Sequence, residues 1–155
     1  MTTFTLNDSL PNLTVVTTKN DSLELSSTRG KNLVLYFYPK DNTPGCTQEG
    51  KDFTDTYAEF TALNTEILGV SKDSVKKHCN FIEKYQFPFD LIADEDETLC
   101  KALDVIKEKN MYGKKYMGIE RSTFVFDSNG VLKAEFRKVR VKGHVEAVLK
   151  AVKSL

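Results

Sequence analysis

The stretch of sequence that decides the fold reads Leu33-Val-Leu-Tyr-Phe-Tyr-Pro-Lys-Asp-Asn-Thr-Pro-Gly-Cys46. Its first six residues, Leu33–Tyr38, form a short apolar and aromatic run that ends at turn-forming residues, which is typical of a buried strand. The following loop is rich in Pro, Asp, Asn and Gly, and Cys46 falls where a helix would begin. We therefore predict a buried strand that leads through a tight loop into a helix with Cys46 near its start.

The rest of the chain alternates short apolar runs with amphipathic helical patterns. Ile67–Ser71 and Phe89–Ala93 are predicted as further buried strands. After Cys46, apolar residues recur at spacings of three and four, which predicts a helix. The other expected elements are a helix capped by Asp73 with the apolar stripe Val75, Cys79, Ile82 and Tyr85, a brief helix holding Leu99, Cys100 and Leu103, a hairpin of Ser122–Asp127 and Val131–Lys138, and a last helix from about His144 to Lys153. This order predicts an α/β fold with a mixed central sheet, because the hairpin adds antiparallel strands.

Composition narrows the class of protein. With 155 residues the default is a single domain over 1–155, and Lys plus Arg and Asp plus Glu both total 22, so no overall field favours nucleic acid or a membrane surface. No stretch approaches the roughly 18 apolar residues of a membrane span, and the N-terminal eight residues lack the features of a secretory signal. An odd count of three cysteines fits a reducing compartment, so we expect a cytoplasmic protein. There is no Cys-x-x-Cys, and His78 and His144 do not cluster with the cysteines, so we expect no metal and no cofactor.

Cys46 is the candidate for a reactive, nucleophilic residue. Backbone N–H groups at the start of a helix lack intrahelical partners, and the helix dipole favours negative charge there. A thiol in this position is stabilised as thiolate, which is the form that attacks electrophiles. A structural cysteine would more naturally sit inside an apolar stripe, so the position of Cys46 indicates a nucleophile.

The segment Pro39-Lys-Asp-Asn-Thr43-Pro-Gly-Cys46 has the form Pro-x-x-x-Thr-x-x-Cys and resembles the active-site signature of peroxiredoxins. The sequence of this segment, continued through Cys46-Thr-x-Glu49, is most similar to the peroxiredoxin Q branch, also called bacterioferritin comigratory protein. The resemblance continues through Asp94-Glu-Asp96, Asn110-Met-Tyr-Gly113 and Gly118-Ile-Glu-Arg121-Ser-Thr-Phe124, and so covers nearly the whole chain. It implies a thioredoxin-like three-layer sandwich and a thiol peroxidase activity.

The resemblance also implies roles for four residues. Cys46 would be the peroxidatic nucleophile, and Thr43 would exchange hydrogen bonds with the bound peroxide. Pro39 would shield the thiolate from water, and Arg121 would hold the thiolate and the peroxide by charge-assisted hydrogen bonds. From the residues alone, a surface salt bridge of Arg121 with Glu120 or another acid is the favoured interpretation.

Ionisation of the thiol contributes little to the rate by itself. Lowering the pKa of a generic thiol from about 8.5 to about 6 would increase the fraction of thiolate roughly 30-fold at neutral pH. The accompanying loss of nucleophilicity would lower the reactivity of each thiolate roughly 10- to 18-fold. The larger contribution must therefore come from donors that stabilise charge on the peroxide oxygens in the transition state. The candidates are the N–H groups of Gly45 and Cys46, the Thr43 hydroxyl and the Arg121 guanidinium.

The sulfur that restores Cys46 after oxidation is the open question. Many relatives carry a resolving cysteine five residues after the nucleophile, where this chain has Lys51. Other members place it in the helix after the second strand, at a position that aligns with Ile82. Cys79 lies one helical turn earlier and is the best candidate, although it could equally be a buried core cysteine. An external or intermolecular thiol is the main alternative, and Cys100 is a weaker one.

The resemblance thus implies a monomeric enzyme that reduces hydrogen peroxide and organic hydroperoxides with electrons from thioredoxin or a similar dithiol carrier. A thioredoxin-like disulfide exchanger is disfavoured, because position 49 is Glu where that chemistry needs a second cysteine. A non-catalytic peroxide sensor or holdase that signals through oxidised Cys46 is the alternative from a different class. It shares the first chemical step and differs in turnover.

Overall fold

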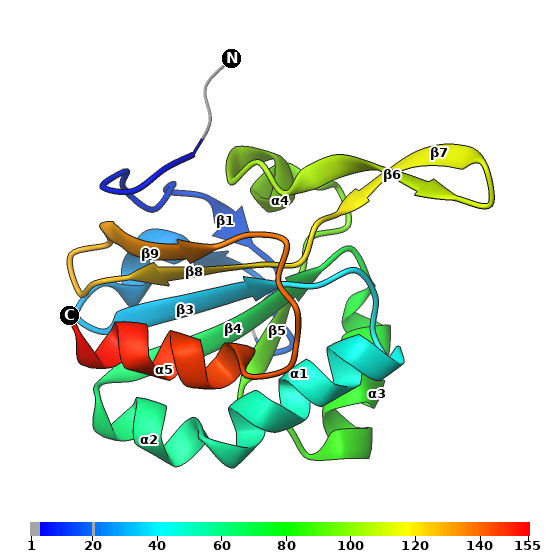
Figure 1. The fold of residues 1–155 in the computed structure, drawn as a ribbon. Coiled ribbons are helices and arrows are strands. Elements are labelled where there is room, and N and C mark those ends of the chain that lie inside the picture. Colours follow the sequence, from blue (N-terminus) through cyan, green and yellow to red (C-terminus); the bar gives the residue numbers. More distant parts are fainter. Residues whose placement is uncertain (1–3, 20) are drawn as a thin grey trace.

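A five-stranded mixed sheet forms the centre of the molecule (Figure 1). The structure is a computed structural model that describes residues 4–19 and 21–155, so the first three residues of the N-terminal stretch considered above lie outside it. The strand order is β5-β4-β3-β8-β9, with β3 at Asn32–Phe37, β4 at Thr65–Ser71, β5 at Asp90–Ala93, β8 at Ser122–Phe126 and β9 at Leu132–Phe136. Strands β3, β4 and β5 are parallel to one another, whereas β8 and β9 are antiparallel to their neighbours. The predicted mixed sheet is confirmed.

Strand β3 is central because it is apolar on both faces. It pairs with β4 from Asn32 opposite Thr65 to Phe37 opposite Val70, and with β8 from Leu33 opposite Phe126 to Phe37 opposite Ser122. A strand that is covered on both faces needs a nearly continuous apolar sequence, which is what the opening stretch supplies. The end of β3 therefore delivers the loop before Cys46 to the edge of the core.

Helices cover one face of this sheet and a thinner layer covers the other. The first face carries α1 at Pro44–Asp55, α2 at Tyr57–Ala62, α3 at Val75–Tyr85 and α5 at His144–Lys153, as Figure 1 shows. The opposite face carries α4 at Thr98–Ala102, the 3-10 helix η1 at Leu25–Thr28, and the short strands β1 at Thr14–Val15 and β2 at Leu23–Glu24. The predicted three-layer sandwich is confirmed.

Two apolar clusters join the layers. Between the sheet and the four helices, Tyr36 stacks on Phe53 at a ring separation of 4.6 Å, and Cys46 belongs to the same cluster. On the opposite face, Phe124 contacts Phe4 and Phe37 edge-on. Cys46 is thus packed against the aromatic core.

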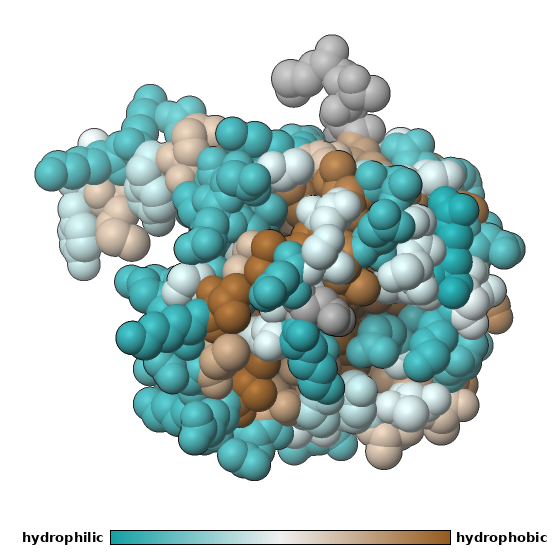
Figure 2. All heavy atoms as spheres, turned by 180° about the vertical axis from the view of Figure 1, so that it is seen from behind, coloured by the Kyte–Doolittle hydropathy of each residue, from teal (hydrophilic) through white to brown (hydrophobic). Residues whose placement is uncertain are grey.

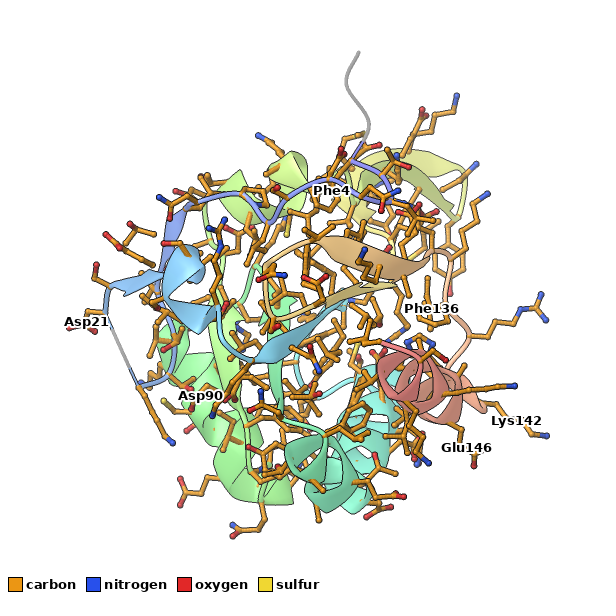
Figure 3. The ribbon with its side chains drawn as sticks, turned by 90° about the vertical axis from the view of Figure 1, so that its left-hand side faces the viewer. Phe4, Asp21, Asp90, Phe136, Lys142 and Glu146 are labelled. Carbon is orange, nitrogen blue, oxygen red and sulfur yellow. The ribbon has the colours of Figure 1, made fainter. Side chains whose placement is uncertain are left out.

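The start of α5 packs under the last strand of the sheet. His144 is its first residue, and its ring meets Phe136 of β9 edge-on at 5.3 Å. Figure 3 shows Phe136 close to this end of α5, whereas Lys142 and Glu146 point away from the body. His144 is therefore directed inward, toward Glu49 of α1.

A two-stranded arm, β6 at Ile106–Met111 and β7 at Lys114–Ile119, projects from the body (Figures 1 and 2). The sequence did not predict this hairpin. Its turn is made by Tyr112 and Gly113, which both have positive φ, and the Tyr112 side chain is 98% exposed. Because most of the arm is exposed and charged, it lacks the apolar alternation by which strands are recognised.

The structure corrects two expectations for α3. Its cap is Ser74, whose side chain accepts from the Lys77 N–H, while Asp73 accepts from Ser71 and from the backbone N–H of Asp41. Its fully buried residues are His78 and Phe81, while Ile82 and Tyr85 of the predicted stripe are partly buried against the core, so the stripe was wrong at Cys79. Cys79 is exposed.

Candidate active site

Cys46 lies in the first turn of α1, as predicted. Thr43 is the N-cap residue with an extended backbone (φ −97°, ψ 156°), and Pro44 is the first helical residue, where its fixed φ suits a helix start. Cys46 is the third residue of the helix and only 2% exposed. Its sulfur therefore combines a helix N-terminus with an apolar surrounding.

Arg121 reaches the sulfur from the residue directly before β8. Its Nη2 lies 3.4 Å from Sγ of Cys46, and its Nη1 donates to Oε1 of Glu49 at 2.7 Å. The guanidinium also passes over Gly45, where a Cβ would lie 3.1 Å from Nη2. The expected salt bridge with an acid exists, but the acid is the buried Glu49 on the same helix as Cys46.

Glu49 is a site residue that the sequence reasoning missed. It follows Cys46 by three residues, so the two side chains share a face of α1, and it is fully buried. Burial raises its pKa from 4.5 to about 7, and this effect outweighs the lowering by Arg121. The i, i+3 spacing from Cys46 was the available signal, but a glutamate at that spacing is usually read as a solvated residue.

His144 lies on the other side of Glu49. Its Nε2 is 2.8 Å from Oγ1 of Thr123 and 3.8 Å from Oε2 of Glu49. Burial, with a smaller contribution from the charge of Arg121, lowers its pKa to about 4. The imidazole is therefore neutral near pH 7, so its approach to Glu49 is not an ion pair there and Arg121 is the cation that balances Glu49.

Two buried polar atoms lie in the same region without a hydrogen-bond partner among the described residues. They are Oε2 of Glu49 and the hydroxyl of Tyr36. Burial and the nearby charge of Glu49 raise the pKa of Tyr36 well above its ordinary value. The phenol thus stays neutral beneath the site and adds no charge to it.

Thr43 and Pro39 belong to the loop between β3 and α1. The Thr43 hydroxyl donates to the carbonyl of Lys40 at 2.9 Å, which leaves its oxygen lone pairs as acceptors. Pro39 is exposed at the end of the strand. Thr43 directly precedes the first helical turn that carries Cys46, whereas the expected shielding of the thiolate by Pro39 stays a prediction.

Lys109 is a second cation near the site. It is half-buried on β6, and its pKa is lowered by burial and by the charge of Arg121, with Cys46 acting in the opposite direction. The charges of Arg121 and Cys46 therefore act on Lys109, a residue of the β6–β7 arm. Lys109 could not be identified from the sequence, because the arm itself was not predicted.

The other two cysteines have opposite environments. Cys79 is exposed on α3, so it is not the core cysteine that its apolar neighbours suggested. Cys100 is fully buried in α4, where the Asp94 carboxylate accepts from the N–H groups of Leu99 and Cys100. Burial and the charge of Asp94 raise the pKa of Cys100 strongly, which makes it a poor nucleophile.

Within residues 4–19 and 21–155, no group of three or more His, Cys, Asp or Glu side chains is placed to hold a metal ion. In the same part of the chain, no helix has the length and apolar character needed to cross a membrane. The site combines a buried sulfur at a helix N-terminus with an arginine fixed between that sulfur and a buried acid. Such an arrangement can stabilise a thiolate and negative charge on a bound oxygen.

A thioredoxin-like sandwich with this arrangement defines the class of thiol peroxidases. The chain belongs to the AhpC/TSA family, whose model matches residues 6–135. It is 58% identical over 122 residues to peroxiredoxin Bcp of Xanthomonas campestris, covering 79% of this chain and 76% of the relative. It is 46% identical to peroxiredoxin Bcp of Bacillus subtilis over 153 residues, covering 99% and 98% of the two chains.

Solved structures agree with this assignment. A peroxiredoxin Q structure from Xanthomonas campestris is 51% identical, covers 94% of both chains and has a TM-score of 0.89. A mutant peroxiredoxin Q from Xylella fastidiosa is 42% identical, covers 99% of this chain and 98% of the other, and has a TM-score of 0.93. The predicted peroxiredoxin Q branch is confirmed, and with it the thiol peroxidase function, with peroxides as substrates and a thiol as reductant.

Proposed function

We propose that Cys46 is the peroxidatic nucleophile and that Arg121, Thr43 and Pro39 complete its site. The observation that carries this proposal is the 3.4 Å approach of the Arg121 Nη2 to the Cys46 sulfur, with Nη1 fixed on Glu49. A guanidinium held at one nitrogen presents its second nitrogen in a defined direction. It can therefore serve the thiolate and a peroxide oxygen bound beside it.

The reaction consumes one peroxide and one proton. The Cys46 thiolate attacks one peroxide oxygen, the O–O bond breaks, and the leaving alkoxide or hydroxide takes up a proton to give an alcohol or water. Cys46 becomes a sulfenic acid, oxidised by two electrons. Negative charge moves onto the oxygens during attack, where Arg121 and the N–H groups of Gly45 and Cys46 stabilise it. The Thr43 oxygen accepts from the O–H of the peroxide, since the Thr43 hydroxyl donates its own hydrogen to the carbonyl oxygen of Lys40.

Cys79 is our candidate for the resolving cysteine. Its thiol condenses with the Cys46 sulfenic acid, which forms an S–S bond and releases one water. Exposure of Cys79 supports this role, whereas the burial of Cys100 argues against Cys100. Since a disulfide needs Cα atoms within roughly 7 Å and Cys46 is buried, helix α1 or α3 must unwind locally first. An external thiol that attacks the sulfenic acid directly is the alternative route.

Oligomeric state, cellular location, reductant and substrates belong to the same proposal. We propose a single domain that acts as a monomer in the cytoplasm, with thioredoxin or a similar dithiol protein as the reductant and no nucleic acid or membrane partner. Hydrogen peroxide and organic hydroperoxides are the proposed substrates. One structural relative, a bacterioferritin comigratory protein of Xanthomonas campestris, was described for its alkyl peroxide reduction activity.

Turnover tests the proposal against a non-catalytic sensor. Peroxide consumption is followed for the wild type and for Cys46→Ser, with thioredoxin, its reductase and NADPH in excess. We expect the wild type to consume many equivalents of peroxide and Cys46→Ser to consume none. A wild type that stops near one equivalent would support the sensor, and activity in Cys46→Ser would overturn the assignment of the nucleophile.

A further inference from the structure

A buried cluster of three polar side chains ties the loop before Cys46 to helix α3. Asp41, in that loop, accepts from the Tyr38 hydroxyl at 2.5 Å, and its Oδ2 lies 2.7 Å from Nδ1 of His78. The other ring nitrogen of His78, Nε2, lies 2.9 Å from the carbonyl oxygen of Ile92 on β5. Asp41 and His78 are 8% and 0% exposed, so these bonds are made away from water.

The partners determine where the protons are. A carbonyl oxygen can only accept, so Nε2 of His78 carries a hydrogen. Nδ1 faces a carboxylate oxygen, so one further proton lies between Nδ1 and Oδ2, whichever of the two atoms holds it. Burial and nearby Tyr36 and Asp41 raise the pKa of Tyr38 well above its usual value, so its hydroxyl stays protonated and donates. The cluster is therefore fully hydrogen-bonded, which makes it stable while closed and costly to leave half open.

The position of the cluster connects the two cysteines. Asp41 lies two residues before Thr43 in the loop that leads into α1, and its own N–H donates to Asp73 in the segment before α3. His78 is the neighbour of Cys79 in the chain. Local unwinding of α3 at His78, or of the start of α1 together with the loop before it, would move one of the two side chains and separate His78 from Asp41.

We propose that His78 is a positioning residue. Its bond to Asp41 holds the segment from Asp41 to Cys46 in place for the reaction with peroxide, and this bond must break before Cys79 reaches Cys46. The inference rests on the proposed roles of Cys46 and Cys79. The closed His78–Asp41 pair favours the reaction of Cys46 with peroxide. The same pair delays the formation of the Cys46–Cys79 disulfide. Its strength therefore sets how long the sulfenic acid survives, and so how readily a second peroxide over-oxidises it.

Two substitutions separate the two bonds of the histidine. His78→Asn places an amide nitrogen near the position of Nδ1 and keeps the donor to Asp41, whereas His78→Gln places one near Nε2 and keeps the donor to Ile92. We expect His78→Gln to form the Cys46–Cys79 disulfide up to about tenfold faster, since one lost charge-assisted bond is worth roughly that factor. Its reaction with peroxide should become slower, and over-oxidation should need more peroxide. His78→Asn should stay close to the wild type.

The opposite signs of the two rate changes are expected of a bond that is present when Cys46 reacts with peroxide and is broken before Cys79 reaches Cys46. Tyr38→Phe removes another bond to Asp41 and should change both rates in the same directions, so the test survives if His78→Gln fails to fold. Lys76→Gln, at an exposed position on α3, is the matched control and should change neither rate. Unchanged or slower disulfide formation in both His78→Gln and Tyr38→Phe would overturn the proposal.

Hydrogen exchange separates this inference from the assignment of Cys79. Amides of residues 41–47 should exchange up to about tenfold faster in His78→Gln than in the wild type, whether or not a disulfide forms. Faster exchange without a Cys46–Cys79 disulfide in the wild type would retain the loop-holding role and reject Cys79 as the resolving residue. Unchanged exchange in His78→Gln and Tyr38→Phe would reject the loop-holding role itself.

Discussion

The guanidinium of Arg121 lies against the backbone of Gly45, so closely that a Cβ at Gly45 would be 3.1 Å from Nη2. That nitrogen is also the one that approaches the Cys46 sulfur. A side chain at position 45 would therefore press on the group that we assign to charge stabilisation. The helix itself tolerates alanine, because Gly45 does not need a positive φ.

Gly45→Ala should thus lower kcat/KM for peroxide by about tenfold, since a displacement of a few tenths of an ångström weakens a directed donor. Stopped-flow kinetics of the reduced enzyme measures this effect. The free energy of unfolding should stay within about 0.5 kcal/mol of the wild type, as alanine is a better helix former than glycine. Gln48→Ala, at an exposed position of the same helix, serves as the control.

Arg121→Lys should lower kcat/KM by about 100-fold, because lysine keeps the charge but cannot hold Glu49 and face Cys46 at the same time. The rate of sulfenic acid formation measures the loss. Arg140→Lys, an exchange at an exposed arginine, should leave the rate unchanged. A loss of less than about threefold in Arg121→Lys would show that charge alone suffices.

Glu49 should make stability fall as pH rises through its titration range. Its pKa is raised by burial to about 7 in the folded state, so the folded chain keeps a proton that the unfolded chain releases near pH 4.5. The stability of the wild type relative to Glu49→Gln should therefore decrease by up to a few kcal/mol between pH 4.5 and about 7. Denaturant unfolding of both proteins across this range tests the sign.

His144 should act in the opposite direction. Because burial lowers its pKa to about 4, the unfolded chain takes up a proton near pH 6.5 before the folded chain does. The stability of the wild type relative to His144→Gln should therefore fall as pH is lowered from 6.5 to 4. The double variant Glu49→Gln/His144→Gln should lack both slopes, and two slopes of equal sign in the single variants would contradict this account.

Cys79→Ser should abolish the intramolecular disulfide after treatment with one equivalent of peroxide, while Cys100→Ser should retain it. The physical reason is access, since Cys79 is exposed and Cys100 is buried in α4. Mass spectrometry of non-reduced peptides measures both outcomes. If the wild type itself lacks a bridge between Cys46 and Cys79, resolution must come from an external thiol.

Much of the fold could be predicted because its central elements are locally distinctive. Leu33–Tyr38 is apolar on both faces, so its burial at the centre of the sheet needs no knowledge of its neighbours. The β6–β7 arm could not be predicted in this way, because it is exposed and its turn uses Tyr112 where Asn would have been a recognisable signal. The burial of His78 on α3 was missed for a different reason. A polar side chain is expected at the surface, but Asp41 and Ile92 provide hydrogen-bond partners for His78 inside the protein.

The candidate site was predicted only as far as a motif extends along the chain. Cys46, Thr43 and Arg121 were proposed from the resemblance to the family, and Cys46 also from its place at a helix start. The burial of Glu49 depends on how α1 lies against the sheet and on where Arg121 and His144 arrive from distant segments. No local pattern carries that information.

The exposure of Cys79 has a cost beyond the catalytic cycle. An exposed thiol is accessible to alkylating agents, and modification of Cys79 alone would leave Cys46 able to react with peroxide. If Cys79 is the resolving residue, such a molecule would still accept one peroxide and would then have no internal route back. Damage at a surface position more than thirty residues from the nucleophile would turn a recyclable catalyst into a single-use scavenger.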